Sequence, residues 1–316
     1  MAINLKEEKI IFMGTPDFGA PCLKMLIENA NVIAVVTQPD KKVGRNQVLT
    51  PPPTKQIALQ NSIPVLQPEQ VRGNPEFLKQ IKELNPDLIV VVAYGFILPK
   101  ELLVIPKFGV INAHASLLPK YRGASPIQSA ILNGDEQTGV TIMILDEQMD
   151  HGPILSQNKV KILPYDDFAT LHDKLADLGA KLLIEILPKY LGGQLQGKKQ
   201  KDTDATYCKL ITKLDGKIDW HKPANEIERQ VRAFNPWPGA FTNWEGKNLK
   251  ILKSEVHWVD EVNKVTGEIY EVNGILKVQC GQEQLELVEL QLEGKNKMSV
   301  KEFINGHPKI IGTILA

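Results

Sequence analysis

The sequence has few cysteines and no excess of charge of either sign. Its 316 residues include three cysteines, Cys22, Cys208 and Cys280, which are far apart and lack the spacing of metal ligands. An odd number of scattered cysteines argues against a disulfide framework and against a zinc site. Lys plus Arg number 37, and so do Asp plus Glu. We therefore expect a cytoplasmic protein without a bound metal, in which only a local patch could hold a polyanion.

Long apolar segments are also missing. The longest, Leu88–Leu98, has eleven residues and contains Gly95, whereas a helix that crosses a bilayer needs about 20. The first eight residues have neither the apolar core of a secretion signal nor the Arg-rich character of an organelle transit peptide. We expect no membrane segment.

Short apolar runs alternate with amphipathic segments through about residue 187. Strands are predicted over residues 9–13, 32–37, 64–66, 88–93, 110–114 and 140–146, and helices over 17–28, 54–60, 75–84 and 126–132. Several of the strands are apolar on both faces, as a parallel sheet covered by helices requires. This pattern predicts a doubly wound, mostly parallel, Rossmann-like α/β domain over residues 1–190, with ligands beyond the carboxyl ends of the strands.

A second domain is predicted after a polar, basic linker over residues 191–207. A helix is expected over 224–234, and strands over 249–256, 267–272, 275–280 and 285–292. Asn273-Gly274 is a turn signal between two of these strands, and Ser299 with Glu302 forms a capping-box pattern. The economical architecture for residues 208–316 is a small OB-like antiparallel β-barrel, a fold that often binds nucleic acid.

Three polar residues stand out in the first domain. Asn112 and His114 are two residues apart in a predicted strand, so their side chains project from the same face. Asp150 follows the next apolar segment. Taken singly, each could be a turn residue or a hydrogen-bonded interior residue. Together, a carboxamide, an imidazole and a carboxylate are suited to acid/base chemistry and to stabilisation of an oxyanion.

The residues after His114 extend this pattern. Asn-Ala-His-Ala-Ser-Leu-Leu-Pro-Lys-Tyr-Arg-Gly (112–123), with Asp150 downstream, resembles the signature of enzymes that transfer formyl groups from 10-formyltetrahydrofolate. The resemblance implies that Asn112, His114 and Asp150 are catalytic. It also implies a folate site formed by Ser116, Leu117, Leu118 and Pro119, with a pterin pocket formed by residues 92–98, including Tyr94, Gly95 and Ile97, and by 146–150.

The chemistry expected of the trio is direct acyl transfer. An amine that attacks a formyl group creates a tetrahedral carbon with a developing oxyanion, which fixed hydrogen-bond donors stabilise. The Asn112 amide and protonated His114 are suitable donors. Asp150 would favour the imidazolium and could accept a proton from the attacking ammonium. We expect no metal requirement.

Two other enzyme classes fit the sequence poorly. Gly14 and Gly19 match the outer positions of a dinucleotide-binding fingerprint, but Pro16 occupies the middle position, where a pyrophosphate must approach bare backbone. We interpret Pro16 as the first residue of a helix. A serine hydrolase is disfavoured because no Gly-x-Ser-x-Gly elbow occurs, and Ser116 is too close to His114 along the chain to be aimed at it.

The loop over residues 37–55 indicates the acceptor. Lys41, Lys42, Arg45 and Lys55 are opposed by Asp40 alone, which suits an acceptor that carries phosphates. Within the formyltransferases, the chain resembles methionyl-tRNA formyltransferases most, and Arg45 matches the arginine of their Gln-Pro-Asp-x-x-x-Gly-Arg pattern.

That resemblance implies methionyl initiator tRNA as partner, bound in part by Lys41, Lys42 and Arg45, with 10-formyltetrahydrofolate as cosubstrate and a monomeric enzyme. Two alternatives stay open: a formyltransferase acting on an amino sugar nucleotide, and an RNA-binding module without catalytic activity. His151, directly after Asp150, departs from the family pattern and leaves its own role open.

Overall fold

The computed structural model describes residues 4–44, 47–257 and 264–315. The chain forms two compact units. The first comprises Met1–Pro126, Gln137–Lys161 and His172–Cys208, and the second comprises Ile127–Glu136, Ile162–Leu171 and Lys209–Ala316. Residues 191–207, predicted to be a linker, lie in the first unit. The functional division into a catalytic and a tRNA-binding domain stays a prediction.

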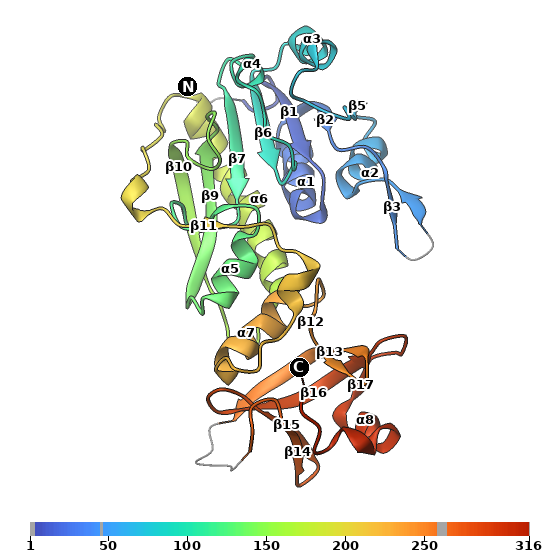
Figure 1. The fold of residues 1–316 in the computed structure, drawn as a ribbon. Helices are drawn as coiled ribbons and strands as arrows, with labels where there is room; N and C mark the ends of the chain where they lie inside the picture. Colours follow the sequence, from blue (N-terminus) through green and yellow to red (C-terminus); the bar gives the residue numbers. More distant parts are fainter. Residues whose placement is uncertain (1–3, 45–46, 258–263, 316) are drawn as a thin grey trace. The chain divides into compact units, whose positions relative to one another are not determined.

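The first unit is built on a seven-stranded sheet of order β10-β9-β7-β6-β1-β2-β5. Its strands are β1 (Lys9–Gly14), β2 (Asn31–Val36), β5 (Val65–Leu66), β6 (Leu88–Val92), β7 (Val110–His114), β9 (Gln137–Ile144) and β10 (Ile154–Lys161). The pairs from β5 to β7 are parallel, while β9 is antiparallel to both β7 and β10. Figure 1 shows these strands side by side. The predicted mostly parallel α/β sheet is confirmed.

Helices follow the strands, and those predicted over residues 17–28, 54–60, 75–84 and 126–132 are present. They are α1 (Ala20–Asn29), α2 (Pro53–Gln60), α3 (Pro75–Leu84), α4 (Lys100–Leu103), α5 (Pro126–Leu132) and α6 (Phe168–Leu191), with the short 3-10 helices η1 (Asp17–Gly19) and η2 (Asp202–Asp204). All five residues of β6 are buried, as expected for a central parallel strand covered on both faces. Pro16 is the N-cap of η1, so it precedes the helix and is not its first residue.

Several elements of the first unit, including strand β10 and a hairpin, were not predicted. Strand β10 has a mostly polar sequence without apolar alternation and lies at the sheet edge. The loop over residues 37–55 contains a hairpin of β3 (Lys41–Val43) and β4 (Val48–Thr50). Its strands are exposed along their whole length, so no burial pattern marks them. In Figure 1 the hairpin projects from this unit beyond α2.

The second unit contains an antiparallel sheet of order β12-β13-β16-β15-β14. Its strands are β12 (Ala240–Trp244), β13 (Lys247–His257), β14 (Ile269–Val272), β15 (Ile275–Gln279) and β16 (Gln284–Leu292), and β17 (Met298–Ser299) pairs with β16. Beside it are helices α7 (Ala224–Phe234) and α8 (Val300–Gly306), and the 3-10 helices η3 (Lys213–Gly216) and η4 (Pro308–Ile310). The predicted antiparallel fold is confirmed, whereas its closure into a barrel stays a prediction.

Local signals in the second unit are present as expected. Asn273 and Gly274 both have positive φ, 54° and 80°, in the tight turn between β14 and β15. Ser299 Oγ accepts a hydrogen bond from Glu302 N, and the Glu302 carboxylate accepts one from Ser299 N, which completes the capping box of α8. A continuous core lies beneath, formed by residues such as Ile227, Leu285 and Phe303.

The described residues contain neither a helix suited to a membrane nor a metal-binding group. None of the described helices is long and apolar enough to cross a membrane. No group of three or more His, Cys, Asp or Glu side chains within residues 4–44, 47–257 and 264–315 is arranged to hold a metal ion.

Candidate active site

His114 ends β7 at the carboxyl edge of the sheet, and its side chain is only 7% exposed. Its Nε2 lies 2.9 Å from the carbonyl oxygen of Tyr121. A carbonyl can only accept, so Nε2 carries a proton and donates it. In the neutral imidazole, Nδ1 is then the basic nitrogen, and it lies 3.6 Å from Oδ1 of Asp150. The ring is therefore fixed in one orientation, with its proton-accepting atom toward a carboxylate.

Asp150 is held from two directions. Its Oδ2 accepts a hydrogen bond of 2.8 Å from the backbone N–H of Gly123, which leaves Oδ1 toward His114. Its backbone has φ +51°, in the left-handed region that aspartate adopts at a cost. Tyr121, whose carbonyl orients His114, has φ +61°. Unfavourable backbone conformations gathered at one place are typical of functional sites.

Asn112 lies two residues before His114 on β7 and is partly exposed. Alternation along the strand directs both side chains to one face. Among the residues that the structure describes, no group is hydrogen-bonded to the Asn112 carboxamide. Its two N–H donors are therefore available to a ligand, as a role at an oxyanion requires.

The predicted folate loop, residues 116–119, is fixed by Thr141, which is fully buried on β9. The Thr141 hydroxyl donates to Ser116 O at 2.7 Å and accepts from Leu118 N at 3.1 Å. Gln157 on β10 donates to both Leu118 O and Thr141 Oγ1 at 2.8 Å. Leu118 is buried, whereas Leu117 and Pro119 are partly exposed. The loop thus has a defined shape, with Leu117 and Pro119 accessible.

The predicted pterin segment leaves the carboxyl end of β6. The Tyr94 ring is 1% exposed and packs in the core against Phe96, and burial raises the pKa of its phenol. The Tyr94 carbonyl accepts hydrogen bonds from Thr15 Oγ1 and Gln38 Nε2. Gly95 and Ile97 are exposed, Ile97 to 69%. A ligand at this segment would meet backbone groups and Ile97, while the Tyr94 ring faces the interior.

A group of buried polar residues beside the trio was not predicted from the sequence. Gln200 donates through Nε2 to the carbonyl oxygens of Asp150 and Gly152, and Arg122 donates to the Gln200 Oε1 atom. Arg122 also forms an ion pair of 2.9 Å with Asp202, and this hydrogen bond is the main reason that the pKa of Asp202 is lowered. Arg122 stands in the quoted motif, but Gln200 lies in a polar stretch with no signal of its own.

His151 has two acidic neighbours. Its Nδ1 is 2.6 Å from Asp146 Oδ2, and its Nε2 is 3.5 Å from Asp202 Oδ1. The side chain therefore bridges the loop that carries Asp150 and the segment that carries Asp202. These contacts account for His151 without a ligand.

The basic hairpin is only partly available to an acceptor. Lys55 forms an ion pair of 2.8 Å with Asp40, and the pKa of Asp40 is lowered chiefly by its hydrogen bond from Gln67 and then by Lys55. Lys41 donates to Gln38 Oε1, while Lys42 is exposed and makes no ion pair within the described part of the chain. Arg45, the third residue predicted to bind tRNA, lies outside the described residues.

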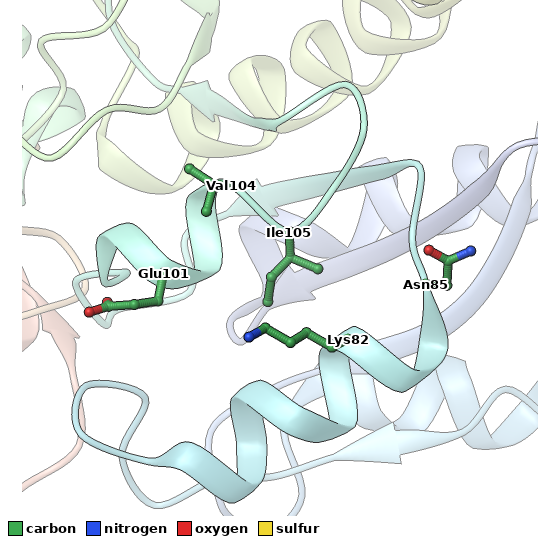
Figure 2. A pocket seen from close by; sticks show the side chains of 5 residues that line it. All are labelled: Lys82, Asn85, Glu101, Val104 and Ile105. Atoms are coloured by element: carbon green, nitrogen blue, oxygen red, sulfur yellow. The ribbon is translucent and has the colours of Figure 1, made fainter.

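Two cavities in the structure lie apart from the trio. One, of about 430 Å³, is lined by Lys82, Asn85, Glu101, Val104 and Ile105, and Figure 2 shows these side chains from α3, from α4 and from the residues that follow each helix. The other, of about 510 Å³ in the second unit, is lined by residues that include Trp220, His221 and Leu315. Neither contains the paired acid and base of the trio.

Comparison with known proteins agrees with this geometry. The formyl transferase family profile matches residues 8–187, and the formyl transferase C-terminal domain profile matches residues 210–308. A methionyl-tRNA formyltransferase from Caldanaerobacter subterraneus subsp. tengcongensis is 50% identical over 309 residues, covering 97% of this chain and 99% of that protein.

Solved structures share the fold at lower identity. An N-formyltransferase from Helicobacter canadensis, in complex with folinic acid and dTDP-3-aminofucose, superposes with a TM-score of 0.67 at 22% identity, covering 89% of this chain and 98% of that one. HypX from Aquifex aeolicus, in complex with tetrahydrofolic acid, gives a TM-score of 0.62 at 15% identity, covering 96% of this chain and 48% of that one.

The two profile matches define an enzyme of the formyl-transferring class, and the solved structures share its fold. Within that class, the extent and level of identity to the Caldanaerobacter protein are decisive. The chain belongs to the methionyl-tRNA formyltransferase family.

Proposed function

We propose that this protein transfers the formyl group of 10-formyltetrahydrofolate to the α-amino group of methionine on initiator tRNA, with Asn112, His114 and Asp150 as catalytic residues. The observation that carries the proposal is the buried His114–Asp150 pair at the end of the strand that presents Asn112. Family membership over nearly the whole chain supports the choice of donor and acceptor.

The first step concerns the amine. The α-amino group arrives as an ammonium and must lose a proton before its nitrogen can attack. Asp150 Oδ1 and His114 Nδ1 face each other at 3.6 Å and together form the proton acceptor. Nε2 keeps its proton on the Tyr121 carbonyl, so the ring does not rotate while Nδ1 gains or loses a proton.

The second step forms and breaks the bonds to the formyl carbon. The amine nitrogen bonds to that carbon, and the carbonyl electron pair moves to oxygen, which the unengaged Asn112 amide and protonated His114 stabilise as donors. When the carbonyl reforms, the bond from carbon to the folate nitrogen breaks. That nitrogen takes the proton that the His114–Asp150 pair accepted in the first step. The pair then accepts one of the two protons on the attacking nitrogen and releases it to solvent, while the other stays as the N–H of the product amide.

The acceptor is proposed to contact the hairpin through Lys41, Lys42 and Arg45. Exposed Lys42 is free to neutralise a phosphate, which is the main source of affinity for nucleic acids. Leu117, Pro119 and the exposed segment around Gly95 and Ile97 are proposed to contact the folate. We further propose that the enzyme is a cytoplasmic monomer that needs no metal.

One assay tests the reaction and separates it from its nearest alternative. Purified protein and 10-formyltetrahydrofolate are incubated in two separate reactions, one with methionyl initiator tRNA and one with an amino sugar nucleotide. Formyl-methionyl-tRNA is the expected product, and the reaction should persist in EDTA. Formylation of the sugar nucleotide alone would overturn the proposed acceptor, and tRNA binding without turnover would leave only an RNA-binding module.

A further inference from the structure

A chain of buried polar contacts begins at the backbone of Asp150. Gln200, which is 5% exposed, donates through one nitrogen to Asp150 O at 2.9 Å and to Gly152 O at 2.8 Å. Its Oε1 accepts from Nε and Nη2 of Arg122 at 3.2 and 3.0 Å. Arg122 is 2% exposed. Both side chains are therefore buried away from solvent.

The backbone that Gln200 holds is one that needs support. Asp150 has φ +51°, a left-handed conformation that favours glycine over other residues. Next along the loop, Gly152 is packed so closely that a Cβ atom would lie 1.9 Å from Ile144 O. The loop therefore has little room to adjust, and its contacts determine where the Asp150 carboxylate points.

Arg122 determines which way the Gln200 amide faces. Two guanidinium N–H groups point at Oε1, so the amide nitrogen faces the carbonyls of Asp150 and Gly152. The reversed amide would place N–H groups against the guanidinium and oxygen against the two carbonyls. Because both side chains are buried, water could not compensate for those lost hydrogen bonds.

We propose that Gln200, oriented by Arg122, is a positioning residue for formyl transfer. It fixes the backbone of Asp150 so that Oδ1 faces His114 and Oδ2 receives Gly123 N. This inference rests on the catalytic role proposed above for Asp150. Since Gln200 touches neither substrate, its loss changes kcat and leaves binding of the folate intact.

The sharpest test is Gln200→Glu, which keeps the size of the side chain. A carboxylate retains both hydrogen bonds from Arg122 and gains an ion pair, but it cannot donate to the carbonyls of Asp150 and Gly152. We expect kcat to fall about 100-fold, the size of effect that a small misplacement of a catalytic group produces. The unfolding temperature should fall, because an oxygen now faces two buried carbonyls, but the protein should stay folded at the assay temperature. The Kd for tetrahydrofolate, measured by calorimetry, should stay close to the wild-type value.

A second readout observes the catalytic pair directly. In protein labelled with ¹⁵N-histidine, the His114 imidazole signals, assigned with His114→Ala, should move in Gln200→Glu. Gln200→Ala is compared with the matched control Gln230→Ala, which also removes a glutamine that donates to two backbone carbonyls. Gln230 donates to Asp215 O at 2.9 Å and Lys217 O at 3.1 Å in the second unit. The control should lose stability while its kcat and its His114 signals stay unchanged.

Each outcome decides the matter. Wild-type kcat and unmoved His114 signals in Gln200→Glu would overturn the positioning role. A fall in kcat matched by an equal loss in the stable, folded fraction would also overturn it, because the effect would then be structural only. Full activity of Asp150→Asn would instead refute the proposed function of Asp150, and the His114 signals of Gln200→Glu would still report whether Gln200 holds the pair.

Discussion

Nδ1 of His114 lies 3.6 Å from Oδ1 of Asp150, and both side chains are largely buried. The separation exceeds that of a good hydrogen bond, so the two atoms are near each other without being bonded. Nε2 and Oδ2, the other polar atoms of the pair, are both engaged by backbone groups. A proton that enters between Nδ1 and Oδ1 would therefore tighten the pair without reorienting either side chain.

Replacing Asn112 by Ala should reduce kcat about 10²–10³-fold, the effect of losing one oxyanion donor. Its amide makes no hydrogen bond to other described residues, so stability should change little. Single-turnover rates with saturating folate measure the chemical step. A loss seen only in KM would show that Asn112 contributes to binding and not to the transition state.

Gly123→Ala should inactivate the enzyme through Asp150. Gly123 has φ +124°, and a Cβ atom there would lie 2.2 Å from Cys208 O, so the backbone must move and the hydrogen bond from Gly123 N to Asp150 must lengthen. We expect a fall in kcat of about 100-fold. Gly109→Ala is the control, because Gly109 also has a positive φ but a Cβ there would meet nothing within 4 Å.

Thr141→Val should weaken the binding of folate. The substitution preserves shape but leaves the buried Leu118 N without its acceptor and removes one of the two hydrogen bonds of the Gln157 amide. The loss is about 1–3 kcal/mol, which the folate loop can relieve by moving. The KM for 10-formyltetrahydrofolate should rise more than kcat falls. Thr138→Val changes another buried threonine of the same strand, one that forms no hydrogen bond with residues 116–119, and it should leave KM unchanged.

Lys42→Gln should weaken tRNA binding without affecting the folate. If Lys42 neutralises one phosphate, the slope of log K against log salt should fall by about 1. Affinity is measured by filter binding across a range of salt concentrations. Lys79→Gln, which removes an exposed lysine paired with Glu83 on α3, should leave the slope unchanged. An unaltered slope for Lys42→Gln would contradict contact with a phosphate.

Asp215→Asn should destabilise the second unit in a pH-dependent way. The hydrogen bond from Lys209 and those from Thr212 lower the pKa of Asp215 from 3.8 to about 2. Because the folded-state pKa is lowered, the stabilisation is complete above the unfolded value of 3.8 and is lost as pH falls toward 2.

The capping contribution is about 1 kcal/mol. Urea unfolding of wild type and Asp215→Asn at pH 7 should therefore differ by that amount, and the difference should shrink as pH falls below about 4. A difference that is the same at pH 7 and pH 3 would show that the carboxylate charge is not the cause.

Much of the fold could be predicted because burial patterns mark it. The predicted β7 and α3 have the bounds that the structure shows, since strand and helix periodicities are clear in apolar runs such as Val110–His114. The exposed hairpin Lys41–Val43 and Val48–Thr50 carries no such pattern. Its pairing depends on contacts between its own strands, which alternation of apolar residues does not reveal.

In the site, too, only the local relationships could be predicted from the sequence. Asn112 and His114 share a strand face, so local geometry alone relates them. Gln200, which donates a hydrogen bond to the backbone carbonyl of Asp150, lies 50 residues later along the chain. Its segment has a polar composition that indicates a linker. Burial of a single glutamine by long-range packing leaves no mark on the neighbouring sequence, and so only the three-dimensional structure could find it.

The positive φ angles of Tyr121 and Asp150 lower the stability of the fold at residues that the catalytic site requires. Each could be relaxed by glycine, which adopts such angles without steric cost. Selection for heat resistance alone would therefore favour glycine at these positions, but at Asp150 it would delete the carboxylate that faces His114. Variants evolved for thermostability should gain their stability elsewhere in the chain and retain this costly backbone.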